Sequence, residues 1–231
     1  MKYIFWDIDG TLLVTGLAGA DALRQAIKEQ FGVENFQFSH PLAGATDSQI
    51  IKQICIDIKG RCHTFDAANL LINYHRLLPQ FLQQRQGHLM PNVEKTLKYF
   101  KGLEGFTTCL LTGNTTTGAY HKLKRYNIDR YFDSRYAVCG ELSEERDELA
   151  KVALRRLQIY FPEQEITGDN IFLIGDTPND IKCAQAIGAR CLAVLAGSTY
   201  TREQLAECKP WKILDKLPDD PKKLEQMFNK A

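Results

Sequence analysis

The first eleven residues constrain this chain more than any other segment. A mainly apolar run, Tyr3–Ile8, carries Asp7 near its end, and Asp9, Gly10 and Thr11 follow. Alternate side chains of an extended strand project to the same side, so the carboxylates of Asp7 and Asp9 can converge on one point. Two carboxylates repel each other when close, and burying them without partners is costly. The pair therefore predicts a site that holds a cation, a shared proton, or a phosphate with its metal.

The size and charge of the chain fit an ordinary globular protein. With 231 residues it can bury a sizeable core, either as one large domain or as a domain with a smaller insert. The formal net charge is +1, so no global basic field attracts nucleic acid or a membrane surface. We interpret the local basic group, Lys122, Lys124 and Arg125, as a solvated helix face. We expect neither nucleic acid nor membrane as a partner.

The seven cysteines are scattered, odd in number and without a CxxC pair. This pattern favours neither a disulfide framework nor a zinc site, and it fits a reducing cytoplasm. The N-terminal apolar run carries Asp7 where the hydrophobic region of a signal peptide would continue. No stretch approaches the length of a membrane span. The expected location is the cytoplasm.

Short apolar runs alternate with amphipathic segments along most of the chain. Near-continuous apolar runs favour strands buried on both faces, as in a parallel sheet. The predicted strands are Tyr3–Ile8, Thr107–Leu111, Tyr136–Cys139, Ile171–Ile174 and Cys191–Leu195, with Lys212–Leu214 as a sixth candidate. The predicted helices between them are Val93–Phe100, Thr117–Tyr126, Glu144–Tyr160 and Asp180–Ile187. The alternation predicts an α/β fold with an open, doubly wound, Rossmann-like parallel sheet.

One interval breaks this alternation. It contains three predicted helices and no convincing strand: Ala20–Phe31, Asp47–Ile58 and Asp66–Arg85. Pro79 lies within the third helix and predicts a kink or a break there. We therefore expect a core domain of residues 1–16 and 86–231, with an all-helical domain of residues 17–85 inserted into it.

Ligands of open α/β sheets bind outside the carboxyl ends of the strands. The residues that follow the first, second and fourth predicted strands are Asp7 to Thr11, then Thr112, Gly113 and Asn114, then Gly175 to Asp180. Carboxylate oxygens with spare positions suit Mg²⁺, which binds few protein ligands together with waters and phosphate oxygens. Thr112 and the amides near Gly113 and Asn114 can hold phosphate at a helix N-terminus. Asp176 and Asp180 can also serve as helix caps.

Three of these segments carry a resemblance to a known family. DIDGT at Asp7–Thr11, LLTGN at Leu110–Asn114 and GDTPND at Gly175–Asp180 resemble the first, second and fourth motifs of the haloacid dehalogenase-like hydrolase superfamily. Their order and spacing match as well, and the resemblance covers nearly the whole chain. The helical insert resembles the cap that this superfamily inserts between its first two motifs. The phosphoglycolate phosphatase-like branch is the most similar.

The third motif of the family is a lysine or arginine, and the sequence leaves its identity open. The best candidate is Arg146 in SEERDELAKVALRRL, since Ser143 can cap a helix whose first turn then contains Arg146. Lys151 is the second candidate. The alternative for Arg146 is a surface salt bridge with Glu144 or Asp147.

The resemblance implies a mechanism for these residues. Asp7 would be the nucleophile that forms an aspartyl-phosphate, and Asp9 the general acid and base. Thr112 and Arg146 would stabilise the transferring phosphoryl group. Phosphate contacts would come from Gly10, Thr11, Gly113, Asn114 and Thr46, although Thr46 is equally well explained as a helix cap. The cofactor would be Mg²⁺, held by Asp7, Asp9 (through its backbone carbonyl), Asp176 and Asp180.

Asp9 narrows the expected reaction within the family. Dehalogenating relatives lack this second aspartate, so its presence favours phosphomonoester hydrolysis or phosphomutation. We favour a phosphatase; a phosphomutase of the β-phosphoglucomutase kind is the alternative, and a non-catalytic binding protein ranks below both. The expected partner is a small phosphorylated metabolite, with phosphoglycolate, a sugar phosphate and a nucleotide monophosphate all open. Nothing in the sequence indicates the oligomeric state.

Overall fold

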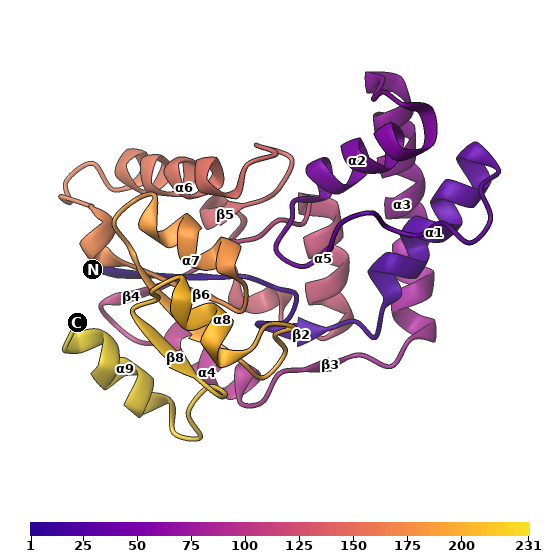
Figure 1. Ribbon diagram of the computed structural model, residues 1–231. Helices are drawn as coiled ribbons and strands as arrows, with labels where there is room; N and C mark the ends of the chain where they lie inside the picture. The colour runs from indigo at the N-terminus through magenta and orange to yellow at the C-terminus, as the bar shows by residue number, and fades with distance from the viewer.

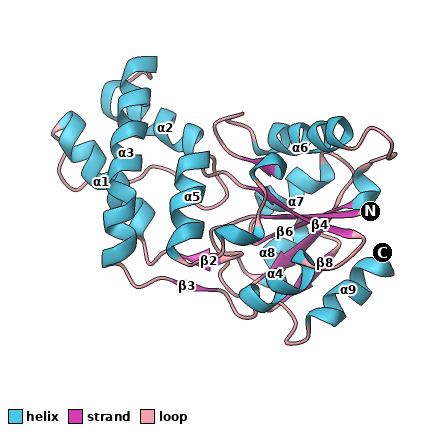
Figure 2. Ribbon diagram, turned by 180° about the vertical axis from the view of Figure 1, so that it is seen from behind, coloured by secondary structure: helices cyan, strands magenta, loops and turns pink.

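The computed structural model describes residues 1–231 and has an α/β fold built on a six-stranded parallel sheet (Figure 2). The sheet order is β5-β4-β1-β6-β7-β8. The strands are β1 Lys2–Trp6, β4 Phe106–Leu111, β5 Ala137–Val138, β6 Ile171–Gly175, β7 Arg190–Val194 and β8 Lys212–Leu214. Every neighbouring pair in this sheet is parallel. The predicted fold class is confirmed, and all six predicted strands are present.

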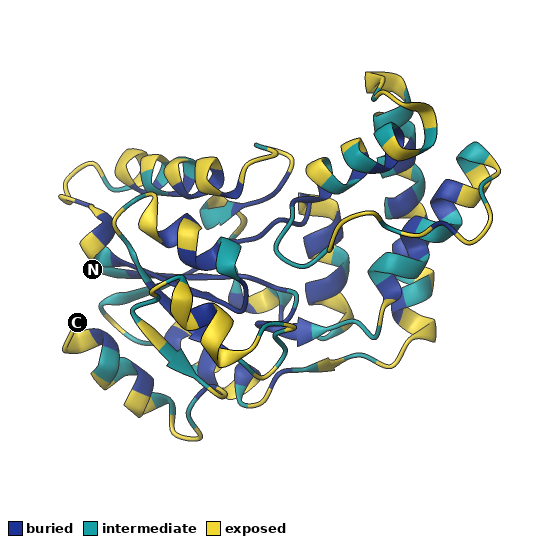
Figure 3. Ribbon diagram, in the orientation of Figure 1, coloured by how far each residue is buried: buried dark blue, intermediate teal, exposed yellow.

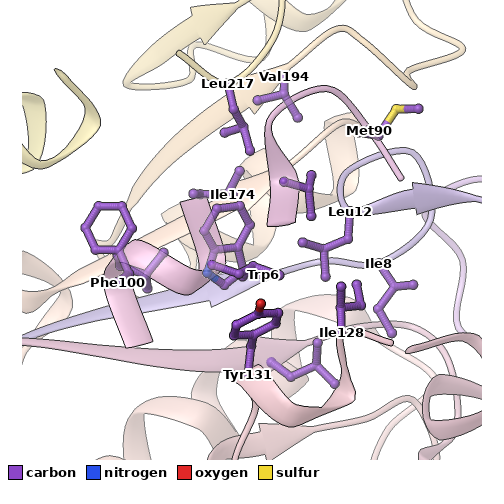
Figure 4. Close-up of a cluster of buried hydrophobic side chains, with 14 of the residues drawn as sticks. Trp6, Ile8, Leu12, Met90, Phe100, Ile128, Tyr131, Ile174, Val194 and Leu217 are labelled. Atoms are coloured by element: carbon purple, nitrogen blue, oxygen red, sulfur yellow. The ribbon is translucent and has the colours of Figure 1, made fainter. Parts of the chain in front are cut away.

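Alternate residues of the strands feed two hydrophobic clusters, one on each face of the sheet. Ile4 and Trp6 of β1 belong to one cluster, and Figure 4 shows Trp6 within it. Tyr3 and Phe5 belong to the cluster on the other face. Adjacent strands follow the same alternation. This two-sided burial explains why the strands have near-continuous apolar sequences.

Helices cover both faces of the sheet (Figure 1). On one side, α4, α5 and α9 contribute Leu97, Leu123 and Phe228 to their cluster. On the other side, α6, α7 and α8 contribute Leu157, Ile181 and Leu205. The bounds are α4 Val93–Lys101, α5 Thr116–Arg125, α6 Arg146–Tyr160, α7 Pro178–Gln185, α8 Arg202–Glu207 and α9 Pro221–Asn229. Short 3₁₀ helices occupy Asp129–Tyr131, Ser134–Tyr136 and Gly168–Asn170.

Three further helices form a separate layer, which we call the cap: α1 Ala18–Phe31, α2 Asp47–Lys59 and α3 Thr64–Gln84. The cap has its own hydrophobic cluster, drawn entirely from residues between Ala18 and Leu82. Buried residues recur along its helices in Figure 3. Helix α5 lies between the cap and the sheet and packs against α3 (Figure 1).

Two features near the cap differ from the sequence prediction. Leu13–Val14 (β2) and His88–Leu89 (β3) pair as a two-residue antiparallel ribbon in the segments that enter and leave the cap. Such short strands carry no readable periodicity. Helix α3 continues through Pro79, so of the expected kink or break the break does not occur, and Leu77, Leu78 and Leu82 around it are buried in the cap. Tertiary packing thus outweighs the loss of the hydrogen bond that proline cannot donate.

No helix in the structure has the length and apolarity that crossing a membrane requires.

Candidate active site

The candidate site lies where the strand order of the sheet reverses. β1 and β6 are neighbours at this position, with β4 on the other side of β1. Asp7 and Asp9 follow β1, whereas Asp176 and Asp180 follow β6. The gap at such a reversal is the usual ligand site of doubly wound sheets. The topology therefore brings the separated sequence motifs to one edge, as the sequence predicts.

Asp7, Asp176 and Asp180 form a buried acidic cluster. One carboxylate oxygen from each lies within 4.8 Å of the others, and all three side chains are nearly inaccessible to solvent. Burial, and then the nearby Asp180 and Asp9 carboxylates, raise the pKa of Asp7 to about 7, although the Arg146 guanidinium acts to lower it. Burial, and then the nearby Asp180 and Asp7 carboxylates, raise the pKa of Asp176 well above its usual range. The three carboxylates together offer an all-oxygen donor set, which fits a divalent cation such as Mg²⁺.

Arg146 is the only cation inside this cluster. It is the first residue of α6, its side chain is 6% exposed, and it donates to Asp180 and to Asp7 Oδ1, the latter at 3.4 Å. Its Nε has no hydrogen-bond partner although it is buried. Lys151, the other candidate, is exposed and pairs with Glu148. The structure therefore brings Arg146 to the cluster and rules out its alternative as a surface salt bridge with Glu144 or Asp147.

Asp180 has both carboxylate oxygens engaged. Oδ1 accepts from Arg146, and Oδ2 accepts from the Thr177 hydroxyl at 2.7 Å and from the Thr177 amide at 3.0 Å. Asp180 thereby completes a capping box at the start of α7. This arrangement orients the Asp180 carboxylate. Compared with Asp180, Asp7 and Asp176 therefore have more carboxylate oxygen available to bind a metal.

Gly10 and Thr11, expected to contact phosphate, lie against Asp176. The Thr11 hydroxyl donates to Asp176 Oδ1 at 2.9 Å. Gly10 has a φ of 80°, and a Cβ at this position would overlap the Asp176 carboxylate. Both residues therefore shape the position of Asp176 in the structure.

The Asp9 carboxylate is separate from the acidic cluster and 45% exposed. Its Oδ2 accepts from Asn114 Nδ2 at 2.8 Å and from Lys122 Nζ at 2.6 Å. Lys122 is a residue that the sequence interpretation assigned wrongly. Lys124 and Arg125 are exposed as expected, but Lys122 is buried because its face of α5 points toward the sheet edge.

The segment after β4 is tightly tied together. The Thr112 side chain is fully buried, and its Oγ1 accepts from Asn114 Nδ2 at 2.8 Å and from the Asn114 amide at 3.3 Å. The carbonyl of Gly113 accepts from the amide of Asp47 in the cap at 2.7 Å. A Cβ on Gly113 would overlap the carbonyl of Ala45, so glycine allows the cap backbone to approach.

Thr46 follows the capping alternative. Its hydroxyl is the N-cap of α2, accepts from the Gln49 amide at 3.1 Å, and donates to the carbonyl of Glu144 at 3.0 Å. The residue is fully buried and does not line the candidate cavity. Its hydroxyl has no remaining donor for a phosphate, so we do not include it in the binding set.

A cavity of about 370 Å³ lies between the cap and the sheet edge. Its polar lining includes Asp7, Asp9, Asn114, Lys122 and Arg146 from the core, with Asp47 and Tyr74 from the cap. Its apolar lining includes Val14, Leu23, Leu42 and Ile50. The volume is at the lower end of the roughly 300–1,000 Å³ that small-molecule sites occupy.

Comparisons with known proteins agree with this architecture. Residues 1–188 match the family model described as haloacid dehalogenase-like hydrolase. The chain is 26% identical over 223 residues to phosphoglycolate phosphatase from Aliivibrio fischeri. This alignment covers 93% of this chain and 92% of that protein. The crystal structure of CbbY from Rhodobacter sphaeroides in complex with phosphate aligns with a TM-score of 0.74 at 16% identity, covering 94% of each chain. A provisionally named β-phosphoglucomutase from Bacteroides vulgatus aligns with a TM-score of 0.71 at 18% identity, covering 100% of this chain and 91% of that one.

The chain belongs to the haloacid dehalogenase-like hydrolase family. Together with its curated phosphatase relatives, this assigns it to the phosphatases, the hydrolases of phosphoric monoesters. The structural neighbours include both a phosphate-bound protein and a mutase-type protein, so they define the fold alone.

Proposed function

We propose that this chain is a Mg²⁺-dependent phosphatase that hydrolyses a small phosphomonoester through an aspartyl-phosphate on Asp7. The proposal rests on one observation. Asp7 belongs to the buried acidic cluster and also lines the cavity that Asp9 and Arg146 line. A nucleophile, a second carboxylate and a buried guanidinium around one small cavity are the parts that phosphoryl transfer requires.

The residues that would hold Mg²⁺ are Asp7, Asp176 and the backbone carbonyl of Asp9. Asp180 would orient Asp176 and Arg146 rather than act as a principal ligand, because hydrogen bonds already engage both of its oxygens. Bound there, Mg²⁺ would supply positive charge that reduces the repulsion between Asp7 and an anionic phosphoryl group.

The chain's own residues account for the proton and bond changes. A carboxylate oxygen of Asp7 attacks phosphorus as the bond to the leaving alcohol oxygen breaks, and protonated Asp9 gives that oxygen its proton. Asp9, now ionised, takes a proton from the water that attacks phosphorus. The bond between Asp7 and phosphorus then breaks and releases inorganic phosphate. Thr112, Arg146 and the amides near Gly113 and Asn114 would stabilise the phosphoryl oxygens.

The cap sets the size of the substrate. Residues 17–85 would form a cap domain on a catalytic core of residues 1–16 and 86–231, which the separate hydrophobic clusters support. If the cap closes over this cavity, the site takes a small phosphorylated metabolite and excludes water during transfer. Phosphoglycolate is the first substrate to test, because the relative from Aliivibrio fischeri is named phosphoglycolate phosphatase. We propose the cytoplasm as the location, because all seven cysteines have free thiols.

Phosphate release from a panel of phosphomonoesters tests this proposal. The panel contains phosphoglycolate, sugar phosphates and nucleotide monophosphates, each with Mg²⁺ and with EDTA, and Asp7→Asn is the control variant. We expect release that requires Mg²⁺ and that the substitution abolishes. Isomerisation of a sugar phosphate without phosphate release would replace the phosphatase with a phosphomutase. Mg²⁺ binding without turnover of any ester would indicate a non-catalytic binding protein.

A further inference from the structure

Lys122 is a buried cation at the edge of the candidate site. It lies on α5, and its side chain is 7% exposed. Its ammonium donates to Asp9 Oδ2 and to Asn114 Oδ1, both at 2.6 Å. Asn114 Nδ2 in turn donates to Asp9 Oδ2 at 2.8 Å. The three side chains therefore close a triangle of hydrogen bonds around one oxygen of Asp9.

The triangle is asymmetric in its exposure. Lys122 and Asn114 are buried, whereas the Asp9 side chain is 45% exposed and lines the cavity. Burying an ammonium group is costly unless hydrogen bonds and an opposite charge compensate it. A simple surface ion pair would leave the lysine in solvent, as its neighbour Lys124 is. Here the cation is fixed in the core and the anion faces the cavity.

The hydrogen bonds to Asp9 leave one oxygen free. Both donors reach Oδ2, and no protein group donates to Oδ1. The backbone beyond Asp9 turns at Gly10, where φ is 80°, so the strand no longer restrains this side chain. Asn114 is itself held through Thr112 Oγ1. The carboxylate thus has one oxygen anchored to the core and the other available to the cavity.

We propose that Lys122, together with Asn114, is a positioning residue that fixes the Asp9 carboxylate for proton transfer to and from the substrate. This inference rests on the proposed function, in which Asp9 is the general acid and base. Anchoring Oδ2 leaves Oδ1 to give its proton to the leaving oxygen in the first step and to accept one from water in the second. Proton transfer depends on the heavy atoms being within hydrogen-bond reach, so a mobile Asp9 would slow both steps.

The test compares leaving groups in the Lys122→Met variant. The leaving group of p-nitrophenyl phosphate departs as p-nitrophenolate without protonation. The alkoxide that leaves an alkyl phosphate such as ethyl phosphate must be protonated by Asp9. We expect kcat for the alkyl ester to fall roughly 10²-fold, the lower part of what acid–base catalysis contributes. With p-nitrophenyl phosphate we expect a burst of nitrophenol at nearly the wild-type rate, followed by slow turnover, because hydrolysis of the phosphoenzyme still needs Asp9 as a base.

Control variants separate this role from others. Lys124→Met replaces the exposed lysine on the same helix and should behave as wild type, and Lys122→Gln replaces the methionine variant if that variant does not fold. Equal losses for the burst and for the alkyl ester would show general structural damage and overturn the proposal. So would wild-type kinetics with every ester, or a rise in KM limited to phosphoglycolate, which would make Lys122 a substrate-binding residue.

Failure of the proposed function gives a different result. In that case the wild-type protein releases no phosphate from any ester, or Asp9→Asn retains wild-type turnover of the alkyl ester. If the wild type and Asp9→Asn behave as proposed but Lys122→Met behaves as wild type, only the positioning role is wrong.

Discussion

The carboxylate of Asp47, in the cap, accepts hydrogen bonds from the amide and the hydroxyl of Thr115, in the core, at 2.8 Å and 3.1 Å. Asp47 begins α2 and Thr115 is the N-cap of α5, so the contact joins the starts of two helices. The Gly113 carbonyl accepts from the Asp47 amide and adds a backbone link. These bonds hold the cap against the sheet edge and close one side of the cavity.

Asp47→Ala should weaken this closure. The substitution leaves the buried amide of Thr115 without an acceptor, which costs about 1–3 kcal/mol of the free energy of unfolding; the Thr115 hydroxyl keeps its hydrogen bond with His75 Nε2. We expect KM to rise more than kcat falls, because the loss affects closure rather than the reacting groups. Denaturant unfolding and steady-state kinetics measure the two effects. Asp57→Ala, at the exposed far end of α2, is the matched control, and equal behaviour of the two variants would contradict this role for Asp47.

Thr11→Val should weaken metal binding. It removes the hydrogen bond from the Thr11 hydroxyl to Asp176 Oδ1 while nearly preserving side-chain volume. Loss of a partner that orients a metal ligand typically lowers metal affinity about 10–100-fold. Titration calorimetry with Mg²⁺ measures the affinity directly, and the Mg²⁺ concentration for half-maximal activity should shift in parallel. Thr11→Ser keeps the hydroxyl and should retain wild-type affinity; identical affinities for the valine and serine variants would refute the proposed role.

Arg146→Met should impair both stability and activity. Without the guanidinium, Asp7 and Asp180 remain buried without their nearest cation, a change that costs about 3–5 kcal/mol when one partner of a buried pair is removed. We expect kcat to fall roughly 10²–10³-fold, as for loss of a group that stabilises transition-state charge. Arg146→Lys, which keeps the charge, should recover part of both losses. Lys151→Met, at an exposed site, should change neither, and an equal effect there would shift the role to Lys151.

The acidic cluster should make the metal-free protein less stable as the pH rises. Burial raises the pKa of Asp7 from its ordinary 3.8 to about 7, so folding favours the protonated form. The stabilising contribution of this proton is full below pH 3.8 and is lost as the pH rises through about 7. In EDTA, the free energy of unfolding should therefore fall across this interval, with a shallower fall for Asp7→Asn.

Mg²⁺ should reverse that loss. A cation bound to the cluster supplies the missing positive charge and binds the folded state alone, so it stabilises most where the carboxylates are ionised. We expect the rise in melting temperature on adding Mg²⁺ to be large at pH 7.5 and small at pH 4.5. A metal effect that is equal at the two pH values, or absent, would mean that the cluster is not the metal site.

The sequence predicts the sheet and the acidic residues well for a physical reason. Strands buried on both faces must be apolar throughout, so β1 and β6 are readable, and parallel strands put their carboxyl ends at one edge. Asp7 therefore meets Asp176 and Asp180 although they lie far from it in the chain. Arg146 is predictable because it lies at the start of a helix that begins near the same edge.

The sequence fails where tertiary packing decides the outcome. Lys122 looks like a solvated residue beside Lys124 and Arg125, yet α5 is covered by the cap on one side and the sheet on another. One signal was present, because Lys122 shares a helix face with Gly118, Ala119 and Leu123, which are all buried. Thr46 is ambiguous in the sequence because one hydroxyl suits both a helix cap and a phosphate contact. In the structure it is the N-cap of α2.

The central claim is that Asp7 becomes phosphorylated during turnover. The most direct measurement is to quench the wild-type protein in acid during turnover of its best phosphomonoester, reduce the acyl phosphate with borohydride, and locate the product by peptide mass spectrometry. Reduction converts a phosphorylated aspartate to homoserine, and the account predicts homoserine at position 7 only when substrate and Mg²⁺ are both present. Continued phosphate release with an unmodified Asp7 would show that water attacks the ester directly, and it would contradict the account.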